Sequence, residues 1–153
     1  MAIYTVTYSG VTTGTALKTI AQAAAASTDR LEIIEWSMSF NGTSASAVPV
    51  LVQLNRQTTA GTGGVSATPA LQDLADSASA STCLTGPLAA TWTAEPTAGV
   101  IIYQDYYTPV GLGPAWQYPL GRGIIVPTSG RMGFVVTAAV AVNCAGHIVF
   151  NEG

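Results

Sequence analysis

Few residues of this chain have side chains suited to catalysis, and no known catalytic motif joins them. His147 is the only histidine, and no Gly-x-Ser-x-Gly motif supplies an activated serine to work with it. Glycoside hydrolysis needs two carboxylates across one cleft. Glu32 and Glu35 lie three positions apart on an alternating segment, so we expect them on opposite faces of one strand. A bond to a tyrosine or a turn amide explains Asp105 more simply. The sequence therefore predicts no enzyme.

Residues that bind metals and cofactors are equally sparse. Cys83 and Cys144 lie far apart, with neither a Cys-x-x-Cys spacing nor a histidine cluster, so no zinc site is expected. They form either one disulfide or two buried thiols, and their spacing does not decide between these. Asp73 and Asp76 are too few for a calcium loop, and the glycines around Gly63 lead to no phosphate-binding helix. We expect no metal and no cofactor.

Aromatic side chains are the remaining candidates for a binding site. Six of them stand in the second half of the chain: Trp92, Tyr103, Tyr106, Tyr107, Trp116 and Tyr118. If exposed together, such rings stack on sugars and would make a carbohydrate-binding module. Tryptophan and tyrosine also dominate protein interfaces and cores. Both interpretations stay open at this point.

Charge is scarce throughout the chain. Only 8% of the residues are Asp, Glu, Lys or Arg, whereas about 25% is usual in soluble domains. Lys18 is the only lysine and the four arginines are scattered, so no basic cluster favours nucleic acid or anionic lipid. Free monomers normally stay dissolved through interspersed charges. We therefore favour a subunit whose exterior is covered by other protein in an assembly, over a neutral secreted or surface β-domain.

Length and sequence context indicate a single domain. The 153 residues fit one domain, 1–153. The N-terminus has no basic region followed by an apolar stretch, so the sequence predicts no signal peptide and synthesis in a cytoplasm. The longest apolar run, residues 134–142, has about half the length that spans a bilayer. No membrane partner is expected.

Alternation of apolar and polar residues is the main structural pattern, and it is typical of half-buried strands. Ile34, Trp36, Met38 and Phe40 point one way, up to the turn dipeptide Asn41-Gly42. The run 48–54 alternates next, so the two segments are expected to pair as a hairpin. A second hairpin is expected from residues 132–142 and 147–151. Further strands are expected at residues 2–8, 100–107 and 123–126.

Two segments are less regular. Residues 15–26 have apolar side chains at helical spacing and many alanines, but they also alternate like a strand. Residues 57–95 are rich in Gly, Ser, Thr and Ala and are expected to be mostly loop, of a length usually found in functional segments. Together the segments predict an all-β sandwich or barrel of about eight strands.

Several short motifs, taken in order, resemble those of one protein family. They are IEWSMSFNG at 34–42, NRQTTAGT at 55–62, AEPT at 94–97, PLGR at 119–122, GRMG at 130–133 and IVFNE at 148–152. Each motif alone has low specificity. Their order and spacing, over nearly the whole chain, are similar to those of the jelly-roll head decoration, or cement, proteins of tailed bacteriophages.

This resemblance implies an antiparallel jelly-roll β-sandwich and a structural role. It implies a homotrimer on the outer capsid surface of the virion, with the major capsid protein as partner, a strand at 15–22, and no catalytic or metal-binding residue. We expect an N-terminal arm, about 1–10, and the loop region, about 57–95, to reach neighbouring subunits. The expected contact residues are Ile3, Tyr4, Trp92, Tyr106, Tyr107 and Trp116.

Overall fold

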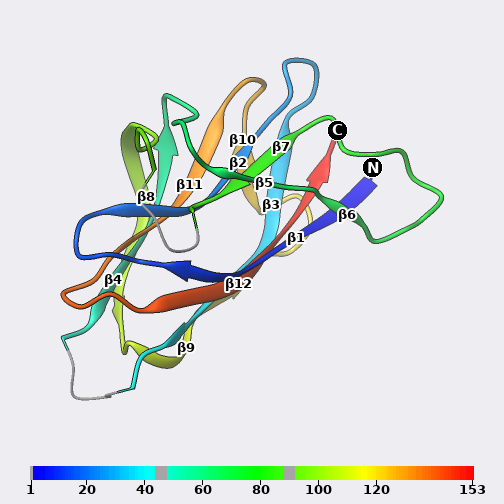
Figure 1. Ribbon diagram of the computed structural model, residues 1–153. Helices are drawn as coiled ribbons and strands as arrows, with labels where there is room; N and C mark the ends of the chain where they lie inside the picture. The colour runs from blue at the N-terminus through cyan, green and yellow to red at the C-terminus, as the bar shows by residue number, and fades with distance from the viewer. Residues whose placement is uncertain (1, 44–47, 88–91) are drawn as a thin grey trace.

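The computed structural model describes residues 2–43, 48–87 and 92–153, so residue 1 of the expected arm and residues 88–91 of the expected loop lie outside it. The described residues form strands and no helix, and hence no helix that could cross a membrane. Two antiparallel sheets pack together as a sandwich (Figure 1), which confirms the all-β class. The strands are β1 (Ala2–Thr12), β2 (Lys18–Ala24), β3 (Leu31–Asn41), β4 (Val50–Gln57), β5 (Val65–Ala67), β6 (Ala70–Leu71), β7 (Thr82–Thr85), β8 (Ala98–Tyr107), β9 (Val110–Gln117), β10 (Ile124–Val126), β11 (Arg131–Thr137) and β12 (Asn143–Glu152).

The strands pair in a nested order. The first sheet has the order β10-β3-β12-β1-β6, with β9 also on β3, and the second has the order β5-β7-β2-β11-β4-β8. Thus β1 pairs with β12, β2 with β11, β3 with β9 and β10, and β4 with β8. Strands β3 and β4 belong to different sheets, as do β11 and β12. Both expected hairpins are therefore wrong, because each short connection crosses from one sheet to the other.

A β-bulge in β3 changes which side chains face the core. The register between β3 and β12 shifts at this point, with Glu35 opposite Val149 but Ile33 opposite Phe150. Ile33 and Trp36 are consequently both buried, and Ile34, expected on the core face, is only half-buried. The bulge also brings Glu32 and Glu35 to the same outer face, which corrects the expectation of opposite faces.

The N-terminal segment is part of the sheet. Strand β1 lies between β12 and β6, with Ala2 opposite Glu152 and Tyr4 opposite Phe150. Its backbone pairs with β12 along most of its length and with β6 at Tyr4 and Thr5, so residues 2–12 are part of the sheet. The segment expected as either helix or strand forms β2, Lys18–Ala24, because its small side chains fit between β7 and β11.

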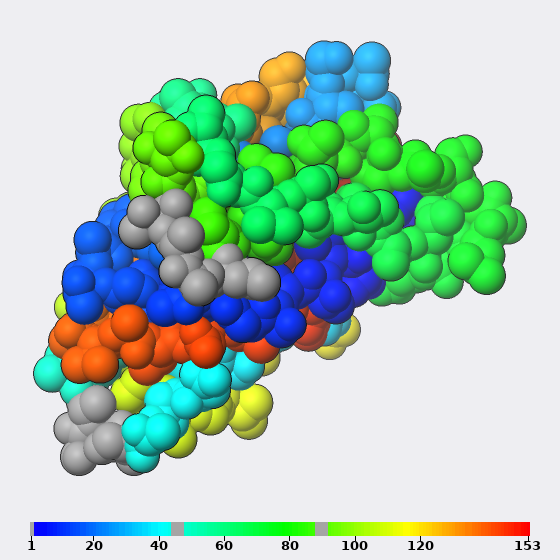
Figure 2. Space-filling model, viewed as in Figure 1, coloured from blue at the N-terminus to red at the C-terminus, as the bar shows by residue number. Residues whose placement is uncertain are grey.

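The described part of the segment 57–95 folds back on the molecule. Strands β5 and β7 extend the second sheet and β6 extends the first. The Glu152 carboxylate accepts hydrogen bonds from the Ser81 N–H at 2.6 Å and the Ser79 hydroxyl at 2.9 Å. The residues just after β6 project beyond the body in Figure 2. Leu74, which follows β6, is 89% exposed. Most of its described part therefore lies against this chain, and the residues around Leu74 extend from it.

Candidate functional site

Two of the expected contact residues lie inside the molecule. The Tyr4 ring stacks on Phe150, with ring centroids 5.5 Å apart, and its hydroxyl donates to the Ser77 carbonyl. The Trp92 indole donates to the Thr19 carbonyl at 2.9 Å and is buried against the outer face of the second sheet. Neither side chain is available to a partner or to a sugar. Ile3 is half-buried in β1, and its carbonyl accepts from the Gln72 N–H at 3.0 Å.

The other expected contact residues lie on one open side of the sandwich. Strands β8 and β9 each pair on one edge only among the described residues, so they leave the second and first sheets unpaired on this side. Rings from both strands meet here: Tyr103 lies 5.5 Å from Trp36 and 5.7 Å from Trp116, measured between centroids. The hydroxyls of Tyr103 and Tyr107 bond to each other, and burial raises the pKa of Tyr107. These rings close the space between the two sheets.

The same side shows large apolar side chains to solvent. On β8 these are Val100, Ile101, Ile102 and Tyr106, and on β9 they are Val110, Leu112 and Trp116. Leu112 is 89% exposed and Tyr106 66%. The β8–β9 stretch, residues 98–117, carries a single charged residue, Asp105, whose carboxylate accepts from the Tyr106 N–H. Exposed apolar side chains of this size on unpaired edge strands mark surface that a partner covers.

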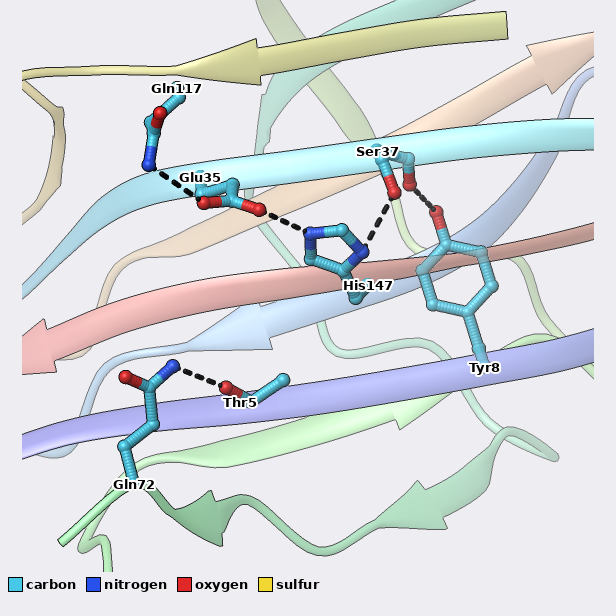
Figure 3. Close-up of polar contacts among 7 residues, drawn as sticks. All are labelled: Thr5, Tyr8, Glu35, Ser37, Gln72, Gln117 and His147. Carbon is cyan, nitrogen blue, oxygen red and sulfur yellow. Dashed lines mark hydrogen bonds and ion pairs between the residues drawn. The ribbon is translucent and has the colours of Figure 1, made fainter. Parts of the chain in front are cut away.

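A polar cluster on the outer face of the first sheet was missed by the sequence analysis (Figure 3). His147 on β12 bonds to two residues of β3: its Nε2 lies 2.7 Å from Glu35 Oε1, and its Nδ1 lies 2.8 Å from Ser37 Oγ. Gln117 on β9 donates to the second Glu35 oxygen at 3.2 Å. The cluster thus joins three neighbouring strands beside a shallow hollow of about 320 Å³.

The order of contacts within this cluster is that of a serine–histidine–acid relay. An ionised carboxylate only accepts hydrogen bonds, so in the neutral imidazole Nε2 carries the proton and Nδ1 accepts from Ser37. In serine proteases the two ring nitrogens have the opposite assignment. Both imidazole nitrogens and both Glu35 oxygens are engaged inside the cluster. Glu35, Ser37 and His147 lie in the regular register of β3 and β12, so the cluster forms because β12 pairs with β3, whereas the sequence analysis expected residues 147–151 to pair with residues 132–142.

Glu32 is held in a second, buried network on the same face. Its carboxylate accepts from the Asn151 amide at 2.9 Å and from the Gly123 N–H at 2.7 Å. The bond from Asn151, with that from Gly123, outweighs burial and holds the pKa of Glu32 below its usual value. A proton added to Glu32 would disrupt these bonds between β3, β12 and the turn before β10.

Glu32 should make stability depend on acid pH. Because its pKa is lower in the folded chain, its contribution is present above its unfolded-state pKa and lost as the pH falls through its folded-state pKa. We expect Glu32→Gln to lower the free energy of unfolding by about 1–3 kcal/mol at neutral pH. Near pH 2 the wild-type side chain is also neutral, and the difference should vanish. Urea denaturation of both proteins at each pH measures this, and an equal loss at both pH values would contradict it.

The two cysteines form no disulfide with each other. Cys83 and Cys144 are free and buried, and burial raises the pKa of each thiol to about 12. Within the described ranges, no group of three or more His, Cys, Asp or Glu residues is placed to hold a metal ion. Comparison with protein-family models, with curated proteins and with solved structures finds no significant match.

Proposed function

We propose that this chain is a structural subunit of a tailed-phage virion that binds the outside of the capsid and stabilises it. In this proposal the subunit is a homotrimer and its partner is the major capsid protein. The observation that carries the proposal is the open β8–β9 side. Exposed apolar side chains lie there on two strands whose outer edges are unpaired, and the stretch carries almost no charge. A protein neighbour that covers this surface removes it from water without burying ions, which avoids the desolvation cost of charged interfaces.

The strand order supports a jelly-roll arrangement. The nested pairs place β1-β12-β3-β9 in one sheet and β2-β11-β4-β8 in the other. A chain folded into such nested pairs and then rolled up gives two packed four-stranded sheets, with β5, β6, β7 and β10 as short additions. Double-sheet jelly rolls occur in viral capsid domains and in lectins. The fold is therefore consistent with a capsid role, and the scarcity of charge favours that role over a lectin.

The experiment combines light scattering with capsid binding. Size-exclusion chromatography with light scattering should give a mass three times that of a single chain, which has a mass of 15.6 kDa. Purified chain should also co-sediment with capsids of its phage that were assembled without it, and raise the temperature at which they lose their DNA. A strict monomer that ignores capsids would contradict the proposal. In that case a glycan-array signal dependent on Trp116 would support the carbohydrate-binding alternative, to which Trp92 is too buried to contribute.

The proposal includes no catalytic role for the Glu35–His147–Ser37 cluster. All its strong donors and acceptors already bond to one another, so we assign it the role of a clamp between β3, β9 and β12. Wild-type protein should hydrolyse 4-nitrophenyl acetate no faster than the Ser37→Ala variant. Ser39→Ala is the matched control, since Ser39 lies on the same face and bonds to the Ala145 carbonyl. Faster hydrolysis by wild type and Ser39→Ala than by Ser37→Ala would contradict the assignment.

A further inference from the structure

The two ends of the sandwich differ in charge. Three stretches of the chain, 36–55, 106–121 and 132–151, contain no Asp, Glu, Lys or Arg. Each stretch includes one connection between strands: β3 to β4, β8 to β9, and β11 to β12. The strand pairings bring the ends of these strands together at one end of the molecule, at the lower left of Figure 1, away from the two termini. The charged residues Arg30, Glu32, Arg131 and Glu152 lie toward the opposite end, whereas Lys18 and Asp105 lie level with Val52, beside the charge-free stretches.

Hydrogen bonds tie the connections at the uncharged end to one another. The Gly42 N–H donates to the Pro109 carbonyl at 2.8 Å, and the Asn143 N–H donates to Asn41 Oδ1 at 3.0 Å. A Cβ at Gly42 would lie 2.4 Å from the Pro109 oxygen and 3.2 Å from Val142 Cγ1. The described parts of the connections are therefore closely packed and form a preorganised surface, which loses little entropy on binding.

This end is apolar and concave. Its residues surround a hollow of about 370 Å³ lined mainly by Val48, Pro109, Val140, Ala141 and Val142. Val48 and Val140 are each about two-thirds exposed at 65% and 67%. Leu112 and Val110 continue the apolar surface along β9, opposite Ser39 and Asn41. A hollow of this size admits one large apolar side chain of a partner.

We propose that this uncharged end is the surface that seats on the capsid shell, where an apolar side chain of the shell protein enters the hollow. The inference rests on the proposed function and adds to it which end faces the capsid. The charged end, with both termini, then faces solvent. Association is most favourable in this arrangement, because the charged side chains stay in water and the apolar side chains are buried in the contact.

The shape of this end favours a protein over a lipid surface as the occupant. Membrane binding uses a convex apolar wedge and is strengthened by basic residues. Here the surface is hollowed, basic residues are missing from all three stretches, and the amides of Asn41 and Asn143 border the hollow. Burying such amides in hydrocarbon without partners is unfavourable, whereas a protein offers them hydrogen bonds.

A matched pair of valines tests the proposal. Val140 borders the hollow and is 67% exposed, whereas Val65, 47% exposed, lies on β5 at the edge of the second sheet opposite β8, outside both the hollow and the β8–β9 side. We expect Val140→Asp to weaken co-sedimentation with undecorated capsids at least tenfold, because it places an unpaired charge in the contact. Val65→Asp should bind within about twofold of wild type. Both variants should keep the wild-type circular-dichroism spectrum, since neither side chain is buried.

Each outcome of this test decides something. If wild type does not bind capsids, the proposed function fails before this inference is reached. If wild type binds but Val140→Asp binds equally well, or Val65→Asp loses as much, the capsid contact lies elsewhere and the inference is overturned. Flotation with neutral phosphatidylcholine vesicles is the third arm: wild-type binding that Val140→Asp abolishes would identify a lipid surface and also overturn the inference.

Discussion

Trp36→Ala is expected to lower the free energy of unfolding by about 3–5 kcal/mol, the largest effect of any single substitution argued for this chain. Trp36 is fully buried on β3 of the first sheet. Its ring contacts Phe134 of the second sheet at 5.7 Å and Tyr103 of edge strand β8 at 5.5 Å, between centroids. Alanine would leave a cavity where the two sheets and the open side meet, and close packing allows little collapse to fill it. Urea denaturation followed by tyrosine and tryptophan fluorescence measures the loss.

Trp36→Phe distinguishes the effect of the lost volume on stability from the effect of the indole N–H. The Trp36 N–H is buried without a hydrogen-bond partner, so phenylalanine removes an unsatisfied donor as well as volume. Because an unsatisfied buried donor is unfavourable, its removal should offset part of the lost packing. We expect Trp36→Phe to lose less than half as much stability as Trp36→Ala. A similar loss for both would show that the N–H has a partner, such as a buried water.

Individual strands could be predicted from the sequence, but their partners could not. Alternation predicted β3, β4, β11 and β12, because a half-buried strand has to alternate whichever strand it pairs with. The connections after β3 and β11 are short and contain turn residues, which also suits a hairpin. A connection of this length reaches either a neighbouring strand or the facing sheet, about 10 Å away. Only the packing of the whole chain decides that these connections run to the facing sheet.

Two features of the outer face of the first sheet could not be predicted. The pairing of β12 with β3 brings Glu35 and Ser37 to His147, and a bulge in β3 moves Glu32 to the same face. Regular alternation through β3 would put Glu32 and Glu35 on opposite faces. The extra residue at Ile34 shifts the register with β12, and so places Glu32 beside Asn151 on the face that Glu35 and His147 share. A bulge depends on how two distant strands fit, so it can be observed in the folded chain but not in 11 residues of one strand.

The sequence shows where the aromatic residues stand along the chain, but it does not show which of them are buried. Tyr4 and Trp92 were expected at a contact and are buried, whereas Tyr106 and Trp116 are exposed. Tyrosine and tryptophan suit both settings, because each has a large apolar ring and one polar group that a backbone carbonyl can satisfy. Tyr4 and Trp92 find such carbonyls at Ser77 and Thr19, far along the chain. Their burial is thus decided by contacts that sequence patterns do not encode.

Gly146→Ala should destabilise the fold by about 3 kcal/mol or more, because the new methyl group has no space. A Cβ at Gly146 would lie 2.1 Å from the Ser37 carbonyl oxygen and 2.6 Å from the Tyr8 hydroxyl oxygen. Tyr8 crosses this glycine to donate its hydroxyl to the same Ser37 carbonyl at 2.9 Å (Figure 3). The carbonyl belongs to β3, which pairs with β12 on one side and β9 on the other, so it cannot move without breaking a sheet.

Two further variants distinguish a steric cause from the loss of the Tyr8 bond. Gly153→Ala is the matched control: no atom lies within 4 Å of a Cβ there, and the free energy of unfolding should stay unchanged. Tyr8→Phe removes only the hydroxyl and should lower stability by about 1 kcal/mol. Gly146→Ala combined with Tyr8→Phe should recover little, because the contact with the Ser37 oxygen remains. Full recovery in the double variant would show that the strain comes from the contact with the Tyr8 hydroxyl, and that β3 and β12 can move apart to make space for the methyl group. That result would contradict the close contact expected between a Cβ at Gly146 and the Ser37 carbonyl.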